Sequence, residues 1–121
     1  MFGAVDHFQP ALELAELPIG AMRKVTVNYQ DVLLVRLAEG VFALAAACPH
    51  ARGPLDRGTL AGAVLTCPWH NWTFDVRSGV SAGGVTARRY PVKVEDGRIL
   101  VDAGAPLATP PPPPIELPED M

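Results

Sequence analysis

Two short segments that each hold a cysteine and a histidine constrain this chain more than any other feature. They are Cys48-Pro49-His50 and Cys67-Pro68-Trp69-His70, and sixteen residues separate His50 from Cys67. A thiolate and an imidazole so close in sequence point to one centre only if the backbone makes a tight loop. The proline after each cysteine favours such a bend over a helix or a central strand. We therefore expect two ligand loops that bring two thiolates and two imidazoles together.

The same residue types also occur in other kinds of site. A structural zinc ion is commonly held by two cysteines and two histidines, but its usual spacing places like ligands close together, whereas each segment here is mixed. Two buried cysteines with unrelated histidines would leave the repeated Cys-Pro pair unexplained. The third histidine, His7, has no cysteine near it and is expected to be an ordinary surface residue.

The chain before residue 105 has the pattern of short strands separated by turns. Residues 22–27 alternate between polar and apolar, whereas residues 32–37 are apolar on both faces and predict a buried strand. Asp96-Gly97 is a strong two-residue hairpin signal. The predicted strands lie at 22–27, 32–37, 41–44, 90–94 and 98–101.

Two segments go against this pattern on propensity alone. Residues 11–17 and the alanines at 45–47 are good helix formers. The rest of the pattern predicts an all-β fold built from antiparallel hairpins. With 121 residues, the chain has room for one ordinary domain.

The C-terminal end differs in composition from the rest. Pro110 to Pro114 form an unbroken run, which favours an extended polyproline II conformation and offers no amide donors to a sheet. Three acidic residues follow, namely Glu116, Glu119 and Asp120, and the remaining chain holds ten acidic and ten basic residues. We expect a folded domain over 1–104 and a disordered proline-rich acidic tail over 105–121, which could serve as a docking segment for a partner.

Charge and hydrophobicity exclude several classes of partner. The formal net charge is −3, whereas binding to nucleic acid or to an anionic membrane surface needs a basic field. The longest apolar run, Val41 to Cys48, is far shorter than the roughly 20 residues that span a bilayer. The N-terminal segment also lacks the features of a secretion signal. We expect no nucleic acid or membrane partner and a cytoplasmic location.

The chain resembles a Rieske-type 2Fe-2S ferredoxin. The resemblance extends over about residues 8 to 103 and is strongest in both ligand segments and their flanks. The matching residues are Cys48-Pro49-His50-Ala51-Arg52-Gly53-Pro54-Leu55, Gly58, Cys67-Pro68-Trp69-His70-Asn71-Trp72-Thr73-Phe74-Asp75 and Ser78-Gly79. It implies a Rieske-type antiparallel β-sandwich with a small cluster-binding subdomain formed by the two ligand loops.

The resemblance also implies the cofactor and its ligands. One iron of a 2Fe-2S cluster would be held by Cys48 and Cys67, and the other by His50 and His70, with two sulfides bridging the irons. In the family the histidine edges face solvent, and electrons enter and leave there.

The residues that flank the ligands would modulate this centre. Pro54, Leu55 and Trp69 are expected to form a flat apolar docking surface, although Trp69 could instead be buried and brace its loop. High-potential relatives have serine and tyrosine where this chain has Trp72 and Phe74, which cannot donate a hydroxyl proton. A reduction potential near the low end of the Rieske range, about −150 mV, is therefore expected.

The function that the resemblance implies is transfer of single electrons, not catalysis. The chain would accept electrons from an NAD(P)H-dependent flavin reductase and pass them to the terminal oxygenase of a Rieske ring-hydroxylating dioxygenase system. An alternative is the small Rieske subunit of an NAD(P)H-dependent nitrite reductase, bound to its large subunit. A zinc-stabilised interaction module is the alternative from another class.

Overall fold

The computed structural model describes residues 8–48, 53–69, 72–81 and 86–104. Within these residues the secondary structure consists of short β-strands and two 3-10 turns, without an α-helix. No helix in the described part of the chain is long and apolar enough to cross a membrane. In chain order the elements are β1 (Gln9–Glu13), η1 (Leu14–Glu16), β2 (Met22–Val27), β3 (Gln30–Leu37), β4 (Gly40–Ala45), η2 (Leu55–Arg57), β5 (Thr59–Ala61), β6 (Val64–Thr66), β7 (Thr73–Asp75), β8 (Arg89–Tyr90), β9 (Val92–Glu95) and β10 (Arg98–Val101).

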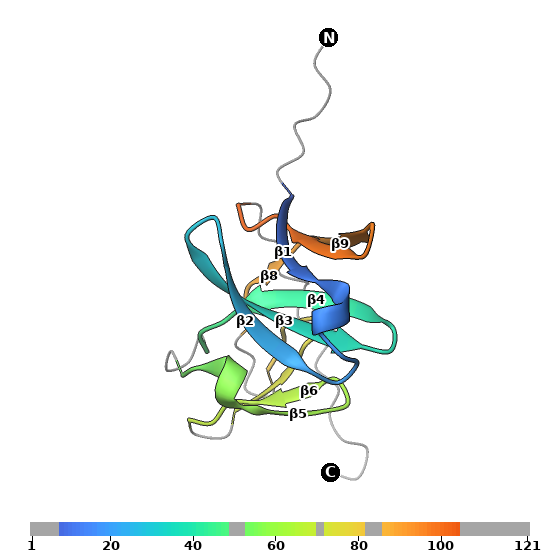
Figure 1. The fold of residues 1–121 in the computed structure, drawn as a ribbon. Helices are drawn as coiled ribbons and strands as arrows, with labels where there is room; N and C mark the ends of the chain where they lie inside the picture. Colours follow the sequence, from blue (N-terminus) through green and yellow to red (C-terminus); the bar gives the residue numbers. More distant parts are fainter. Residues whose placement is uncertain (1–7, 49–52, 70–71, 82–85, 105–121) are drawn as a thin grey trace, which may run out of the picture.

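The strands form three antiparallel sheets (Figure 1). The central sheet has the order β2-β3-β4-β8, the second has the order β1-β10-β9, and the third and smallest has the order β5-β6-β7. Every pairing between these strands is antiparallel. The all-β fold class expected from the sequence is confirmed.

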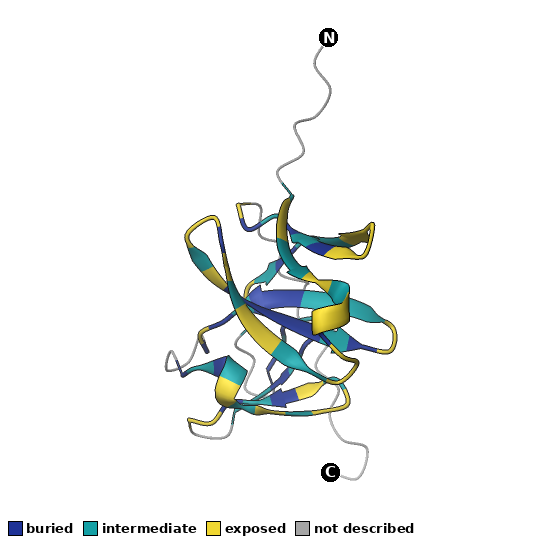
Figure 2. Ribbon diagram, viewed as in Figure 1, coloured by how far each residue is buried: buried dark blue, intermediate teal, exposed yellow. Residues whose placement is uncertain are grey.

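Strand β3 separates two hydrophobic cores. Its side chains alternate, so that Val32 and Leu34 belong to the core shared with the β1-β10-β9 sheet, whereas Leu33, Val35 and Leu37 belong to the core shared with the small sheet. All five are buried, and much of β3 is dark blue in Figure 2. The prediction that residues 32–37 form a strand buried on both faces is confirmed.

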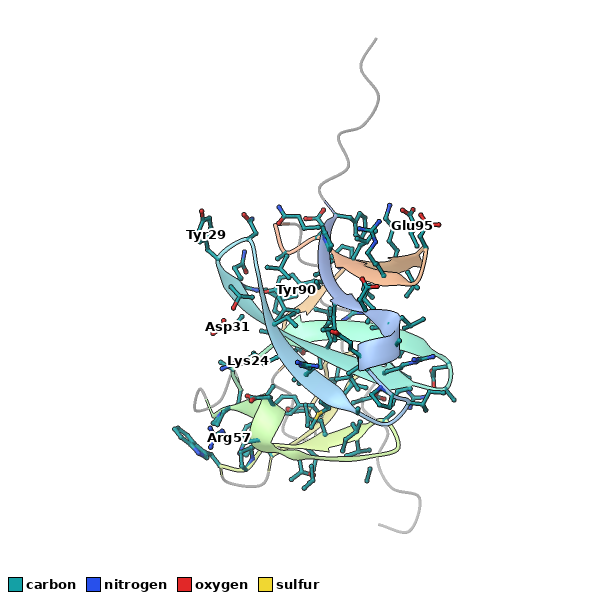
Figure 3. All side chains as sticks on the ribbon, viewed as in Figure 1. Lys24, Tyr29, Asp31, Arg57, Tyr90 and Glu95 are labelled. Carbon is teal, nitrogen blue, oxygen red and sulfur yellow. The ribbon has the colours of Figure 1, made fainter. Side chains whose placement is uncertain are left out.

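Two tight hairpin turns use backbone that is unusual for residues with side chains. Asp96 and Gly97 join β9 to β10 with φ values of 53° and 76°, as the Asp-Gly signal predicts. Asn28 and Tyr29 join β2 to β3 with φ values of 52° and 65°. Tyr29 is 98% exposed and lies at the opposite end of the molecule from Arg57 of η2 (Figure 3).

The segment with high helix propensity at 11–17 does not form an α-helix. Its first residues complete β1, which pairs with β10, and only Leu14–Glu16 make a single 3-10 turn. The amide of Leu14 donates a hydrogen bond to the carbonyl of Gly97 at 2.9 Å. Pairing with a distant strand therefore overrides local propensity here. Ala45 likewise belongs to a strand, β4.

Candidate metal centre

Two loops of the same construction carry the two cysteines. The amide of Cys48 donates to the carbonyl of Gly53 at 2.9 Å, and the amide of Cys67 donates to the carbonyl of Trp72 at 2.7 Å. In both cases the hydrogen bond joins the cysteine to the fifth residue after it. In each segment a main-chain hydrogen bond thus joins the two ends, as expected for a tight loop.

Strand pairing holds the base of each loop. Ala47 forms an antiparallel bridge with Pro54 at the first loop, while Thr66 of β6 pairs with Thr73 of β7 at the second. The loops thus extend from two hairpin-like supports. His50 and His70, the predicted imidazole ligands, lie outside the described residues, as does His7.

The two cysteines lie together in the core between the central and the small sheet. Both side chains are fully buried and neither forms a disulfide. Burial raises the pKa of the Cys67 thiol, the amide of Trp69 lowers it by donating to Sγ at 3.4 Å, and the neighbouring Cys48 thiol raises it. Two adjacent buried thiols ionise readily only when a positive centre compensates their charge, which fits a metal ion or cluster that takes both sulfurs as ligands.

The residues expected to surround the ligands occupy different environments. Trp69 is 50% exposed and Pro54 is partly buried, so both contribute to the surface beside the loops. Trp72 is partly buried and packs against the core that contains the cysteines. Leu55 is fully buried, so the expectation that it forms part of a contact surface is wrong. The first turn of η2 directs this side chain into the core instead.

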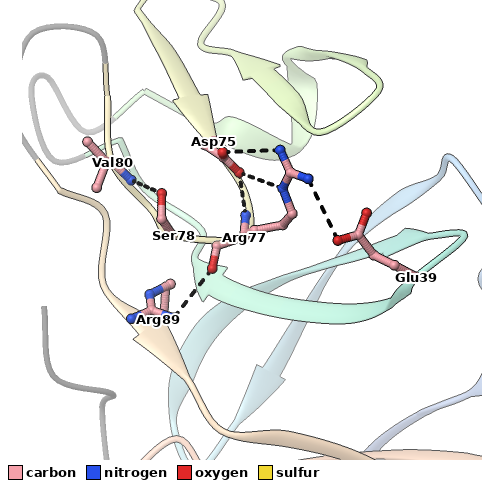
Figure 4. A network of polar contacts seen from close by, with 6 residues as sticks. All are labelled: Glu39, Asp75, Arg77, Ser78, Val80 and Arg89. Atoms are coloured by element: carbon pink, nitrogen blue, oxygen red, sulfur yellow. Dashed lines mark hydrogen bonds and ion pairs between the residues drawn. The ribbon is translucent and has the colours of Figure 1, made fainter. Parts of the chain in front are cut away.

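A polar network fixes the turn that follows β7 to the central sheet (Figure 4). The main-chain amide and Nε of Arg77 donate to Oδ1 of Asp75 at 2.8 and 3.2 Å. Nη1 of Arg77 lies 3.8 Å from Oε2 of Glu39, in the turn between β3 and β4. Nη1 of Arg89 in β8 donates to the carbonyl of Arg77 at 3.4 Å. The network therefore connects the small sheet to strand β8 and to the β3–β4 turn of the central sheet.

The charges in this network shift two pKa values. Burial acts to raise the pKa of Asp75, but hydrogen bonds from Arg77 outweigh it and lower the pKa overall. The hydrogen bond to Asp75 raises the pKa of Arg77, and the charges of Asp75 and Glu39 add to this effect. This network was not predicted from the sequence, although the turn residues Ser78 and Gly79 after Asp75 are a local signal for it.

The fold and the paired loops place the chain in the class of small β-proteins that hold a metal centre between two hairpin loops. Residues 7–95 match the model of the Rieske [2Fe-2S] domain, and the chain belongs to this family. Its cofactor is a Rieske-type 2Fe-2S cluster. This finding favours the iron–sulfur interpretation over a zinc site.

Several of its relatives are ferredoxins of oxygenase systems. The chain is 33% identical to the ferredoxin component of the naphthalene 1,2-dioxygenase system of Pseudomonas aeruginosa, over 76% of this chain and 91% of that protein. Among solved structures, the ferredoxin of carbazole 1,9a-dioxygenase from Nocardioides aromaticivorans is 30% identical, with a TM-score of 0.74 over 79% of this chain and 97% of that one. A chain from a complex of reduced oxygenase and oxidized ferredoxin in carbazole 1,9a-dioxygenase is 26% identical, with a TM-score of 0.73 over 78% of this chain and 92% of that one.

Proposed function

We propose that this protein is a one-electron carrier that accepts electrons from an NAD(P)H-dependent flavin reductase. It passes them to the terminal oxygenase of a Rieske ring-hydroxylating dioxygenase system. The observation that carries the proposal is the pair of identically closed loops that brings two buried thiols together beside a half-exposed tryptophan. The ferredoxin components among its relatives support the same role.

We assign the four ligands by the chemistry of the donor set. Cys48 and Cys67 would hold one iron, because their thiols are adjacent and buried. His50 and His70 would hold the other, since each belongs to the same short loop as one of the cysteines. The bound cluster supplies a reversible one-electron couple.

The described residues around the thiols would exclude water and help to set the reduction potential. Leu55 and Phe74 are fully buried in the core that contains both cysteines, so they shield the sulfurs from solvent. The amide of Trp69 donates to Cys67 Sγ, but neither Trp72 nor Phe74 has a hydroxyl that could add a further donor. We expect a midpoint of about −150 mV, at the low end of the Rieske range, which suits electrons drawn from NAD(P)H.

The partner would contact the protein beside the ligand loops. Trp69 follows Cys67 by two residues and is half-exposed, so its outer edge is available for an apolar contact close to the sulfur. Pro54 lies at the base of the first loop and is also accessible. Substitution of Trp69 by alanine should slow electron transfer to the oxygenase more than it changes the midpoint potential, because it removes contact area and leaves the main-chain donor to Cys67 in place.

The first experiment determines the cluster and its ligands. Protein purified without oxygen should contain two irons and two acid-labile sulfides per chain and give a Rieske EPR signal when reduced. His50→Ala and His70→Ala should abolish this signal, whereas the matched control His7→Ala should leave it unchanged. Stoichiometric zinc without iron, or an intact signal in either ligand variant, would contradict the assignment.

The second experiment tests the direction of electron flow. NADH or NADPH should reduce the cluster only in the presence of a flavin reductase, and the reduced protein should then be reoxidised by a terminal oxygenase in single-turnover mixing. A midpoint above about +100 mV would contradict the argument from missing hydroxyl donors. Stable association with a large protein that contains flavin and haem would instead support the nitrite reductase alternative.

A further inference from the structure

Gly53 lies where the two ligand loops touch each other. It belongs to the first loop, because its carbonyl accepts the hydrogen bond from the amide of Cys48 at 2.9 Å. Its Cα nevertheless faces the second loop, and the residue is buried. Gly53 therefore contributes to the closure of one loop and to the surroundings of the cysteine in the other.

A side chain at this position would meet the sulfur of the second loop. An ideal Cβ built on Gly53 lies 2.9 Å from Cys67 Sγ, 3.0 Å from Cγ of Trp69 and 3.2 Å from Cβ of Trp69. The distance to sulfur is much shorter than the usual contact of about 3.5 Å or more between non-bonded heavy atoms. One of the two groups would have to move.

Glycine is required at this position because neighbouring side chains leave no space for a Cβ, and not because of its backbone conformation. The glycines with positive φ in the described residues are Gly20, Gly40, Gly62, Gly79 and Gly97, and Gly53 is not among them. Alanine could adopt the backbone of Gly53 without strain, so the missing methyl group matters only for what it would touch.

Gly53 differs in this respect from Gly58, which is also crowded. A Cβ on Gly58 would collide with the main-chain carbonyl of Thr66, so that glycine is required by the packing of the backbone. The three atoms nearest to a Cβ on Gly53 all belong to side chains, and the nearest is the thiol sulfur that we assign as an iron ligand.

The geometry points to Gly53 as a positioning residue that sets the place of the Cys67 sulfur. The sulfur receives the amide of Trp69 at 3.4 Å, and it lies 2.9 Å from the position that a Cβ of residue 53 would occupy. A methyl group at residue 53 displaces the sulfur from this position and with it the hydrogen bond that tunes its charge. The inference rests on the proposed role of Cys67 as a ligand.

The test compares Gly53→Ala with Gly104→Ala in the full chain that holds its cluster. Gly104 is a matched control, because its φ is also outside the positive range and, among the described residues other than its chain neighbours, its ideal Cβ comes no closer than 3.6 Å to any atom. The readouts are iron and sulfide per chain, the g values of the reduced protein and the midpoint potential. Gly53→Ala should shift the g values and the potential and lose bound iron, whereas Gly104→Ala should match the unaltered chain.

A second variant separates the sulfur from the indole. Trp69→Ala removes the Cγ contact but leaves Sγ in place, so Gly53→Ala combined with Trp69→Ala should keep the altered g values. Their return to those of Trp69→Ala alone would show that the indole was the displaced group and would overturn the inference.

Two further outcomes also decide the matter. Iron content, g values and potential equal to those of the unaltered chain would overturn the inference, as would a Gly53→Ala chain that has lost its far-ultraviolet strand signal, since that indicates a purely structural glycine. Loss of iron with the strand signal intact would support it. Failure of the proposed function itself is distinguishable, because it would show as a missing iron–sulfur signal in the unaltered chain.

Discussion

Leu55 follows the first ligand loop and is expected to contribute much of the stability of the cluster site. It is fully buried in the core that also contains both cysteines, Leu65 and Phe74. Leu55→Ala removes its side chain beyond Cβ and leaves a cavity, whereas its main-chain hydrogen bonds to Ala46 and Gly58 remain. We expect the free energy of unfolding to fall by about 3 kcal/mol, within the usual range for buried leucine to alanine.

The assay for this loss is thermal unfolding of the chain with its cluster. In a domain of about 100 residues, a loss of about 3 kcal/mol corresponds to a decrease in Tm of roughly 12 to 24 °C. All variants should be compared at one scan rate, because loss of the cluster makes unfolding irreversible.

Two controls make the comparison specific. Ile19→Ala removes the same number of atoms from a side chain that is 61% exposed, and should cost less than about 1 kcal/mol. Leu55→Met keeps the volume and should cost less than about 1.5 kcal/mol. If Leu55→Ala lowers Tm no more than Ile19→Ala does, the burial of Leu55 has been misjudged.

Three further predictions concern parts of the chain away from the sulfurs. Tyr29→Gly should raise the free energy of unfolding by about 0.5 to 1 kcal/mol in a Tm comparison, since Tyr29 has a φ of 65°, whereas Asn28→Gly should change it less because asparagine tolerates positive φ. Arg77→Gln should raise the pKa of Asp75 in an NMR titration. The small stabilisation of the fold by this exposed pair should be present above the ordinary pKa of aspartate, and it should be lost as the pH falls through the lowered pKa of folded Asp75. A chain that ends before Pro110 should keep its visible spectrum and Tm, because a proline run can neither pair as a central strand nor supply a ligand; a marked decrease in either would place the domain boundary beyond residue 104.

Local sequence was sufficient for several parts of the fold. The Asp96-Gly97 pair predicted a hairpin because its two residues accept the positive φ that the turn needs, and both adopt it. The apolar residues on both faces of 32–37, interrupted only at Arg36, predicted a strand buried on both faces, and β3 does separate two cores. The two ligand segments likewise predicted tight loops, and each cysteine lies at the start of its own loop.

Local sequence was a poor guide where distant contacts compete with propensity. Residues 11–17 favour a helix by composition, yet β1 pairs with β10, about ninety positions away in the chain, and the hydrogen bonds of that pairing decide the backbone. Leu55 was expected at the surface because it follows a ligand loop. An apolar side chain next to a site can face either the solvent or the core, and Leu55 faces the core.

What the sequence alone determined was the chemistry: which donor atoms exist, how far apart they lie along the chain, and where the backbone can turn. Only the tertiary structure decided which residues of the two loops lie next to each other. Gly53 lies close to Cys67 and Trp69, which follow it in the chain by fourteen and sixteen residues. Glycine is required at residue 53 because these side chains leave too little space for a methyl group. Steric fit of this kind depends on how two hairpins pack together, and no property of either segment by itself encodes it.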